Sequence, residues 1–298
     1  MYNWPVRMGT MVTAGAKSAE YIRQIKGYGF ESFSVSFGDN VEGVDLPLVA
    51  SQIKDELAET GAIVSSVSAF GNPLMDDEKA QKTRDALSTL IDNAHLFGCD
   101  VVTGFAGRVV DKPIDESIPR FVEVFKPLAQ KAQDKGIRIA FENCDMGGTW
   151  NTGGWNIAQT PAAWEMMFNA IGMDNVGLQW EPCHQMVKLI DPMPQLRKWV
   201  SKIFHVHGKD ATILWDVVKE HGVYGPHQFA FHRTPGYGDS NWADIISELI
   251  RGGFKGSIDI EGWHDPVYNG ELEMTGQVNG LNYLKKCRGE VYIPNPVL

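Results

Sequence analysis

The sequence predicts an α/β fold in which eight parallel strands, each followed by a helix, close into a (β/α)8 barrel. The first observation behind this prediction is a repeated order of segments: an amphipathic helix, then a glycine, then a short apolar strand. The second is the number of strand candidates, because eight such units suit a closed barrel. The third is that no G-x-G-x-x-G turn follows the first strand, as it would in a doubly wound sheet that binds a dinucleotide.

Glycine marks the end of a helix and the approach of a strand at five places. A glycine just beyond a helix adopts positive φ without a Cβ clash, so it is the expected residue there. Strands that alternate with helices pair in parallel through crossover connections. The five junctions are Ile25 to Gly29 before Phe33–Phe37, Leu57 to Gly61 before Ile63–Val67, Ala94 to Gly98 before Val101–Gly104, Ala132 to Gly136 before Ile137–Phe141, and Leu249 to Gly253 before Ser257–Ile260.

The predicted elements account for most of the chain in order. Strands are expected at Arg7–Val12, Phe33–Phe37, Ile63–Val67, Val101–Gly104, Ile137–Phe141, Val176–Trp180, Ile203–Val206 and Ser257–Ile260. Helices are expected at 17–28, 47–60, 78–97, 115–135, 161–171, 191–201, 242–252 and near 272–287. The length suits one barrel, and no linker or low-complexity stretch interrupts the order. We therefore expect residues 1–298 to form a single TIM-barrel domain.

Composition and charge favour a small-molecule partner over nucleic acid or a membrane. Apolar residues make up 43% and charged residues 21%, as in ordinary globular proteins. The net charge of −10 disfavours binding to a phosphate backbone. The four cysteines are widely spaced, the N-terminus has no signal pattern, and no apolar run reaches the roughly 18 residues that span a bilayer. We expect a cytoplasmic protein with reduced thiols.

Ligand-type side chains stand at the ends of four successive predicted strands, the fifth to the eighth. Glu142 and Glu181 directly follow the fifth and sixth strands, His207 lies at the end of the seventh, and Glu261 directly follows the eighth. In a barrel these strand ends converge on one rim, where active sites lie. One glutamate at a strand end is usually a solvated charge, but four ligand-type residues at consecutive strand ends predict a metal pocket.

Three carboxylates and one imidazole make an oxygen-rich donor set. Such a set suits one divalent metal, Mn²⁺ first, with Mg²⁺, Co²⁺ or Zn²⁺ as alternatives. Without a cation the carboxylates would repel one another, and one of them would take up a proton. His205 has the same parity as His207 and points to the same face, deeper in the barrel, where a core or supporting role is expected.

Two long connections should add residues to the same rim, because both follow strands. They run from Asn143 to about Pro161 and from Lys209 to Asn241. Four tryptophans at or just after strand ends also suit a sugar, whose C–H faces pack on indoles, although large aromatics can equally cap the barrel. They are Trp150, Trp155, Trp180 and Trp263. No Gly-rich phosphate cradle is present, which favours a non-phosphorylated sugar.

These residues resemble the sugar isomerase/epimerase superfamily of xylose-isomerase-like TIM barrels (the AP endonuclease family 2 type). The resemblance is close over the second half of the chain. The stretches that carry it are Ile139-Ala-Phe-Glu142-Asn143, Gly177-Leu-Gln-Trp-Glu181-Pro-Cys-His184, His205-Val-His207-Gly-Lys209-Asp210, Pro235-Gly-Tyr-Gly238 with Trp242, and Ile258-Asp-Ile-Glu261. They are specific for the superfamily and say little about the individual substrate.

The resemblance implies a role for each residue of the site. It implies one metal held by Glu142, Glu181, His207 and Glu261, with Glu142 and Glu261 as an acid/base pair across the substrate. Substrate contacts are expected from His184, Arg233, Lys209, Trp150, Trp180 and Trp263. Lys209 could instead pair with Asp210. One departure is that the second ligand is usually Asp in this family, whereas here it is Glu181. Relatives often associate, so a homo-oligomer is also an expectation.

The implied function is a metal-dependent sugar or keto-sugar isomerase or epimerase that moves a proton through a metal-stabilised enediolate. The first alternative uses the same metal for a lyase or dehydratase reaction on a keto-sugar, inosose or keto-glycoside. The second is an abasic-site endonuclease, which the net charge and the lack of ligands on the first four strand ends disfavour. The third is a non-catalytic sugar-binding protein.

Overall fold

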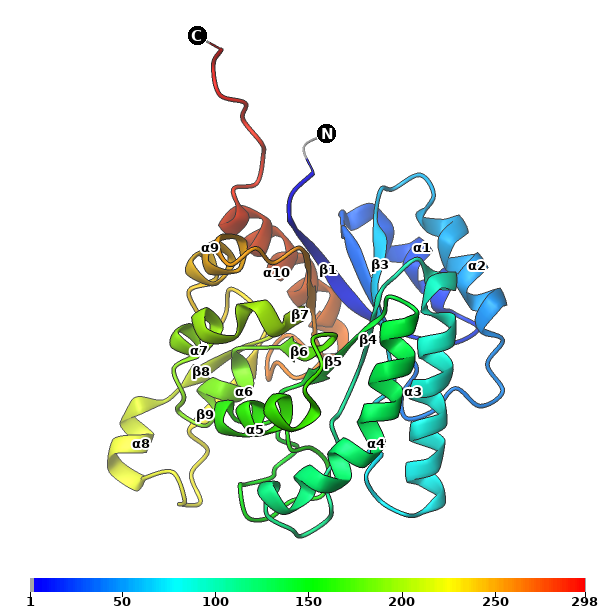
Figure 1. Ribbon diagram of the computed structural model, residues 1–298. Coiled ribbons are helices and arrows are strands. Elements are labelled where there is room, and N and C mark those ends of the chain that lie inside the picture. The colour runs from blue at the N-terminus through cyan, green and yellow to red at the C-terminus, as the bar shows by residue number, and fades with distance from the viewer. Residues whose placement is uncertain (1–2, 298) are drawn as a thin grey trace.

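The computed structural model describes residues 3–297 and contains a closed barrel of eight parallel strands (Figure 1). Around the barrel the strands follow the order β1-β10-β7-β6-β5-β4-β3-β2. β1 pairs with both β10 and β2, and this pairing closes the ring. The barrel strands are β1 (Val6–Thr13), β2 (Ser32–Ser36), β3 (Ile63–Ser68), β4 (Val101–Gly104), β5 (Arg138–Glu142), β6 (Val176–Trp180), β7 (Ile203–Gly208) and β10 (Gly256–Ile260). The predicted fold class is confirmed.

Helices cover the outside of the barrel and bury their apolar faces against the strands. They are α1 (Ser18–Ile25), α2 (Leu46–Leu57), α3 (Glu78–Phe97), α4 (Ile114–Asp134), α5 (Pro161–Ile171), α7 (Pro192–Trp199), α9 (Trp242–Arg251) and α10 (Glu273–Arg288). Side chains that accept hydrogen bonds from the first turn fix several starts, as Asp77 does for α3 and Thr160 does for α5. Left-handed Gly98 and Gly172 end the same two helices, and the sequence predicted the first of them.

The long connection after β7 is not a plain loop. It contains a two-stranded antiparallel sheet of β8 (Asp210–Ile213) and β9 (Ala230–Arg233), with the short helix α8 (Trp215–His221) between them. In Figure 1 this segment projects from the barrel, with α8 at its outer end. A second short helix, α6 (Cys183–Met186), follows β6. Both additions lie on the rim where the strands end, and so they shape the site.

A polar cluster occupies the interior of the barrel below the rim. Buried Asp259 accepts hydrogen bonds from Ser32 Oγ at 2.5 Å and from Ser65 Oγ, and it pairs with His205 Nε2 at 2.7 Å. Gly9 borders this cluster, and a Cβ there would lie 2.1 Å from Asp259 Oδ1. The glycine therefore makes room for a buried carboxylate. Among residues 3–297, no helix is both long and apolar enough to cross a membrane.

Candidate metal centre

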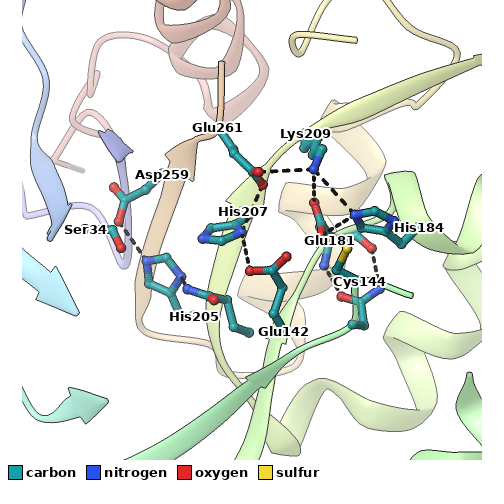
Figure 2. A network of polar contacts seen from close by, with 12 residues as sticks. Ser34, Glu142, Cys144, Glu181, His184, His205, His207, Lys209, Asp259 and Glu261 are labelled. Carbon is teal, nitrogen blue, oxygen red and sulfur yellow. Dashed lines mark hydrogen bonds and ion pairs between the residues drawn. The ribbon is translucent and has the colours of Figure 1, made fainter. Parts of the chain in front are cut away.

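The four predicted metal ligands converge at the carboxyl ends of four adjacent strands (Figure 2). Glu142 is the last residue of β5, Glu181 directly follows β6, and His207 lies near the end of β7. Glu261 directly follows β10. One ligand atom from each of the four lies within 4.8 Å of all the others, and all four side chains are buried. Strand parity and barrel closure together produce this arrangement.

The hydrogen bonding of the cluster leaves several ligand atoms without a partner. Both carboxylate oxygens of Glu181, both ring nitrogens of His207, and Oε2 of Glu261 have no hydrogen-bond partner among the described residues. Buried polar atoms are normally paired, since an unpaired one keeps the full cost of leaving water. Three carboxylates and an imidazole that face one another and keep several atoms unpaired fit a divalent cation, although Lys209 and His264 donate to Glu261 Oε1 and His184 Nε2 lies 3.0 Å from Glu181 Oε1.

Burial and mutual repulsion set the protonation of the cluster without a cation. Burial, together with the charges of Glu181 and Glu261, raises the pKa of Glu142 to about 8, against a lowering effect from His207. Burial would also raise the pKa of Glu261, but Lys209 and His207 hold it well below its usual value. The pocket thus contains one carboxyl that favours its proton and one that favours its charge.

Lys209 places a buried ammonium beside the ligands. Its Nζ lies 3.1 Å from Glu261 Oε1, 3.8 Å from Glu181 Oε2 and 3.4 Å from His184 Nε2. Burial would lower the pKa of Lys209, but Glu181 and Glu261 raise it well above its usual value. The side chain is therefore charged, and it offsets part of the negative charge of the three carboxylates. Asp210 does not pair with it, but accepts from Trp242 Nε1 at 2.9 Å.

Two asparagines hold the backbone that carries the ligands. Asn143 donates from Nδ2 to the Glu181 carbonyl at 2.9 Å and accepts from the Glu181 amide at 2.7 Å. Asn156 donates to the carbonyls of Glu142 and Cys144. Asn143 was included in a sequence motif without an assigned role, and Asn156 was not identified from the sequence at all. A lone asparagine in a long connection carries no pattern that reveals which carbonyl it will reach.

A cavity of about 690 Å³ opens above the four ligands. We call it the reaction cavity. Glu142, Glu261, His184 and Lys209 lie on its polar side, and an apolar wall with Phe70, Phe105, Trp155 and Trp263 completes it. Three of the predicted substrate-binding residues therefore line it: His184, Lys209 and Trp263. His232 and His264 also line it, and the sequence did not single them out. His264 Nε2 lies 2.9 Å from Glu261 Oε1.

The other three predicted substrate-binding residues lie outside the lining of this cavity. Trp180 is fully buried and donates from Nε1 to Gln185 Oε1 at 2.8 Å. Trp150 packs against the hydrophobic core. Arg233 donates from Nε to Asp265 Oδ2 at 3.1 Å. Neighbouring residues of a strand face opposite sides, so β9 presents His232 to the cavity and turns Arg233 away.

His205 lies beneath the ligands, as its parity predicts. Its Nδ1 lies 2.9 Å from Gln179 Nε2 and its Nε2 lies 2.7 Å from Asp259. The ring meets His207 edge-on, with centroids 5.5 Å apart. Both nitrogens of His205 thus have hydrogen-bond partners, whereas Nε2 of His207 has none and its Nδ1 faces the carboxylates of Glu142 and Glu261. This contrast identifies His207 as the histidine that is open to a ligand.

Comparison with known proteins gives a family match over most of the chain. The family model described as xylose isomerase-like TIM barrel matches residues 22–287. An uncharacterized protein of Bacillus subtilis (strain 168), YfiH, is 25% identical over 243 residues, which is 70% of this chain and 74% of that protein. An inosose dehydratase of Bacillus cereus (strain AH820) is 27% identical over 169 residues, covering 55% of this chain and 53% of that protein.

Solved structures show the same fold at low sequence identity. The 3-keto-D-glucoside 4-epimerase YcjR of E. coli superposes with a TM-score of 0.71 at 15% identity, covering 95% of this chain and all of that one. An L-ribulose 3-epimerase superposes with a TM-score of 0.68 at 17% identity, covering 96% of this chain and 94% of that one. At these identities the likeness concerns the fold.

Proposed function

The chain belongs to the xylose isomerase-like TIM barrel family, and from that premise we propose that it is a divalent-metal-dependent isomerase or epimerase of a sugar or keto-sugar. The observation that carries the proposal is the convergence of Glu142, Glu181, His207 and Glu261, whose ligand atoms lie together and are largely without hydrogen-bond partners. The similar folds of an L-ribulose 3-epimerase and a 3-keto-D-glucoside 4-epimerase support it.

In this proposal the four residues hold one divalent cation, with Mn²⁺ the first candidate. When bound, the cation would act as a Lewis acid toward negative charge that develops on substrate oxygens. The Glu181 carboxylate is buried and lies in the ligand cluster with Oε2 without a hydrogen-bond partner, so a glutamate at this position can still supply a ligand despite its extra methylene. Asn143 would keep that carboxylate in place through its two hydrogen bonds to the Glu181 backbone.

Glu142 and Glu261 are the proposed proton-transfer groups. They approach the His207 ring from different strands, with carboxylate oxygens 3.6 and 3.3 Å from Nδ1. Figure 2 shows Glu261 above and Glu142 below this one nitrogen of the ring. One carboxylate would remove a proton next to the substrate carbonyl, and a proton would return to the other carbon or the other face. Return of the proton to a different carbon gives isomerisation, and its return to the opposite face of the same carbon gives epimerisation.

His184 and Lys209 would bind substrate oxygens on one side of the reaction cavity. His184 Nε2 lies 3.0 Å from Glu181 Oε1. Lys209 Nζ lies close to His184, Glu181 and Glu261. A charged ammonium and an imidazole at hydrogen-bond distance can orient hydroxyl groups and stabilise an oxyanion. Trp263 would pack on the apolar face of the sugar ring.

A lyase or dehydratase acting on a keto-sugar is the second candidate. The buried Lys209 ammonium is compatible with it, because a fixed positive charge could stabilise the negative charge that develops on a departing hydroxyl oxygen. The 27% identity to an inosose dehydratase also supports it. The two candidates share proton removal next to the carbonyl and differ in the product, so product analysis separates them: loss of water or of an aglycone would replace the isomerase proposal.

The proposed function is tested by metal removal and isotope exchange. The protein is stripped with chelator, reloaded singly with Mn²⁺, Mg²⁺, Co²⁺ or Zn²⁺, and incubated in D₂O with ketoses, aldoses and keto-sugars. We expect metal-dependent deuterium uptake at a carbon next to the carbonyl. Deuterium uptake that is the same with and without metal would contradict the metal requirement.

Glu261→Gln separates an enzyme from a sugar-binding protein. The amide keeps the size of the side chain but cannot take a proton, so turnover should fall by about a thousandfold or more while the protein stays folded. Glu271→Gln is the matched control, because Glu271 is exposed and lies outside the reaction cavity. Unchanged turnover in Glu261→Gln would remove Glu261 from the proton transfer.

A further inference from the structure

We infer that the substrate is an uncharged two-ring sugar, a disaccharide or a sugar glycoside, whose second ring occupies a side cavity beside the metal centre. The inference rests on the proposed function and adds the substrate class. The side cavity measures about 450 Å³ and includes Ala14, Ala16, Lys17, Tyr21, Trp263 and Glu273 among its lining residues. These residues belong to the β1–α1 connection, to α1, to the loop after β10 and to α10.

The two cavities adjoin one another on the rim of the barrel. Met11, Thr13 and Trp263 line both of them. Cavities of about 300–1,000 Å³ hold drug-sized ligands. The reaction cavity alone, at about 690 Å³, lies within that range, and the side cavity adds about 450 Å³ next to it. One sugar ring would leave most of this space to water, whereas a two-ring sugar would extend across the shared wall.

Trp263 stands where the link between the two rings would pass. It lies two residues beyond Glu261, and 46% of it is exposed although it borders both cavities. An exposed indole at a cavity wall offers a flat apolar face to the C–H face of a sugar ring. A ring held beside Glu261 therefore has its neighbouring ring within reach of Trp263.

The side cavity carries the groups that a neutral polyol needs. Lys17 and Glu273 contribute one charge of each sign, and Tyr21, Thr13 and Gln277 add polar side chains. Donors and acceptors mixed in this way can hydrogen-bond several hydroxyl groups. Gln277 already donates to Glu273 at 2.9 Å, but a purely apolar substituent would offer no hydrogen bond to Lys17, Tyr21 or Thr13, so a second sugar ring suits the side cavity better.

The charges around the reaction cavity disfavour a phosphorylated or otherwise anionic substrate. Four carboxylates line it, and they belong to Asp39, Glu142, Asp145 and Glu261. The two ammonium groups already have carboxylate neighbours: Lys79 lies 3.8 Å from Asp39, and Lys209 lies 3.1 Å from Glu261. A phosphate is normally bound by arginine or lysine side chains that are free to meet it. An uncharged ligand avoids this repulsion.

The test compares matched sugars on the Mn²⁺-loaded full chain. Deuterium exchange is followed with glucose against cellobiose, and with fructose against isomaltulose and fructose 6-phosphate. We expect a kcat/KM for the disaccharide about tenfold above that for its single ring, and no gain from the phosphate. Ala16→Trp narrows the side cavity and Trp263→Ala removes the shared indole, so the disaccharide-to-monosaccharide ratio should fall about tenfold in each.

Two control variants and a binding measurement keep the outcomes distinct. Ala243→Trp adds the same bulk at an exposed site on α9, and Trp215→Ala removes an exposed indole from α8; both should keep the wild-type ratio. Saturation-transfer NMR should show that both rings of cellobiose touch the wild-type protein. It should also show that one ring loses contact in Ala16→Trp.

Each result favours or overturns the inference. Monosaccharide exchange without a disaccharide gain, or a gain that Ala16→Trp leaves unchanged, overturns the side cavity as a sugar site and leaves the proposed function intact. Preference for fructose 6-phosphate overturns an uncharged substrate. If no sugar of this panel and no ketose, aldose or keto-sugar of the earlier one exchanges, the proposed function fails. The NMR contacts then decide whether two rings are bound: saturation of both rings supports the two-ring ligand, and saturation of neither overturns it.

Discussion

Lys209 is an ammonium buried among carboxylates at the centre of the site. It is 2% exposed and lies within 4 Å of both Glu181 and Glu261. Breaking a buried charge pair from one side leaves the other charge without compensation, which costs about 3–5 kcal/mol. In the absence of a cation, the positive charge of Lys209 therefore stabilises the cluster of proposed ligands. A bound cation would take over part of this role.

Lys209→Met should reduce the free energy of unfolding by about 3 kcal/mol in chelator, because three carboxylates then face one another without the ammonium. Added Mn²⁺ should restore part of the loss, since a cation would replace the missing positive charge. Urea denaturation with EDTA and with Mn²⁺ measures both values. Lys198→Met, which removes an exposed ion pair with Glu165, serves as control and should show a much smaller loss. Equal losses for Lys209→Met with and without Mn²⁺ would contradict this account.

Single residues were predictable where a strand fixes their direction. The convergence of Glu142, Glu181, His207 and Glu261 followed from strand ends and from the period of two along a strand. Side chains on connections have no such period. Trp150 accordingly packs against the core and His264 lines the reaction cavity without any sequence signal. Trp180 ends β6 and faces away from Glu181 by the same period of two, and His232 lies on β9, a strand too short for its period to be recognised.

At the scale of elements, an ion pair joins the end of α10 to the start of the barrel. Arg288 donates from Nη1 to Glu31 Oε2 at 2.6 Å and from Nη2 to Glu31 Oε1 at 2.8 Å. Its Nη1 also donates to the Val6 carbonyl, and the Met8 amide donates to Glu31. Burial would raise the pKa of Glu31, but Arg288 and the Met8 amide lower it below its ordinary value. Folding therefore favours the charged carboxylate.

This ion pair should make stability depend on acid in a defined direction. The contribution of Glu31 is complete above the pKa that the carboxyl has in the unfolded chain, and it is lost as pH falls through the lower pKa of the folded state. Glu31→Gln should cost about 2 kcal/mol at neutral pH, and the difference from wild type should shrink below about pH 4. Urea titrations at several pH values measure this difference. The exposed Glu59→Gln is the control; a constant difference across pH for Glu31→Gln would argue against the ion pair.

The elements that the sequence did not reveal are short. β8 and β9 have four residues each, and α6 has four. A segment of this length carries too few residues for a period to emerge. β8 and β9 are specified by each other across the antiparallel pairing of Asp210–Ile213 with Ala230–Arg233, a long-range contact that local pattern does not encode. The eight barrel strands, by contrast, were predicted to within two residues of their ends.

For the whole molecule, the division of residues 1–298 into one domain is a proposal that unfolding can test. The barrel is closed by the pairing of its first strand with its last, so each strand has two neighbours. Removing any strand takes one pairing partner away from each of two others, and we therefore expect the barrel to unfold in one step. We expect a single transition by calorimetry, with the same midpoint by far-UV and tryptophan signals. Mn²⁺ should raise the midpoint temperature, and the unfolding should still occur in a single transition. Two separated transitions would show independent units.

The part of the chain before β5 and the part from β5 onward differ in what they contribute to the rim. All four proposed ligands lie between residues 142 and 261, whereas the reaction cavity is also lined by Met11 on β1, Ser36 on β2, Phe70 just after β3 and Phe105 just after β4. Substitutions before β5 can therefore reshape the space around a substrate without touching any of the four proposed ligands. Proteins descended from one such ancestor can keep a shared chemical step in one part of the gene while the other part drifts toward new sugars.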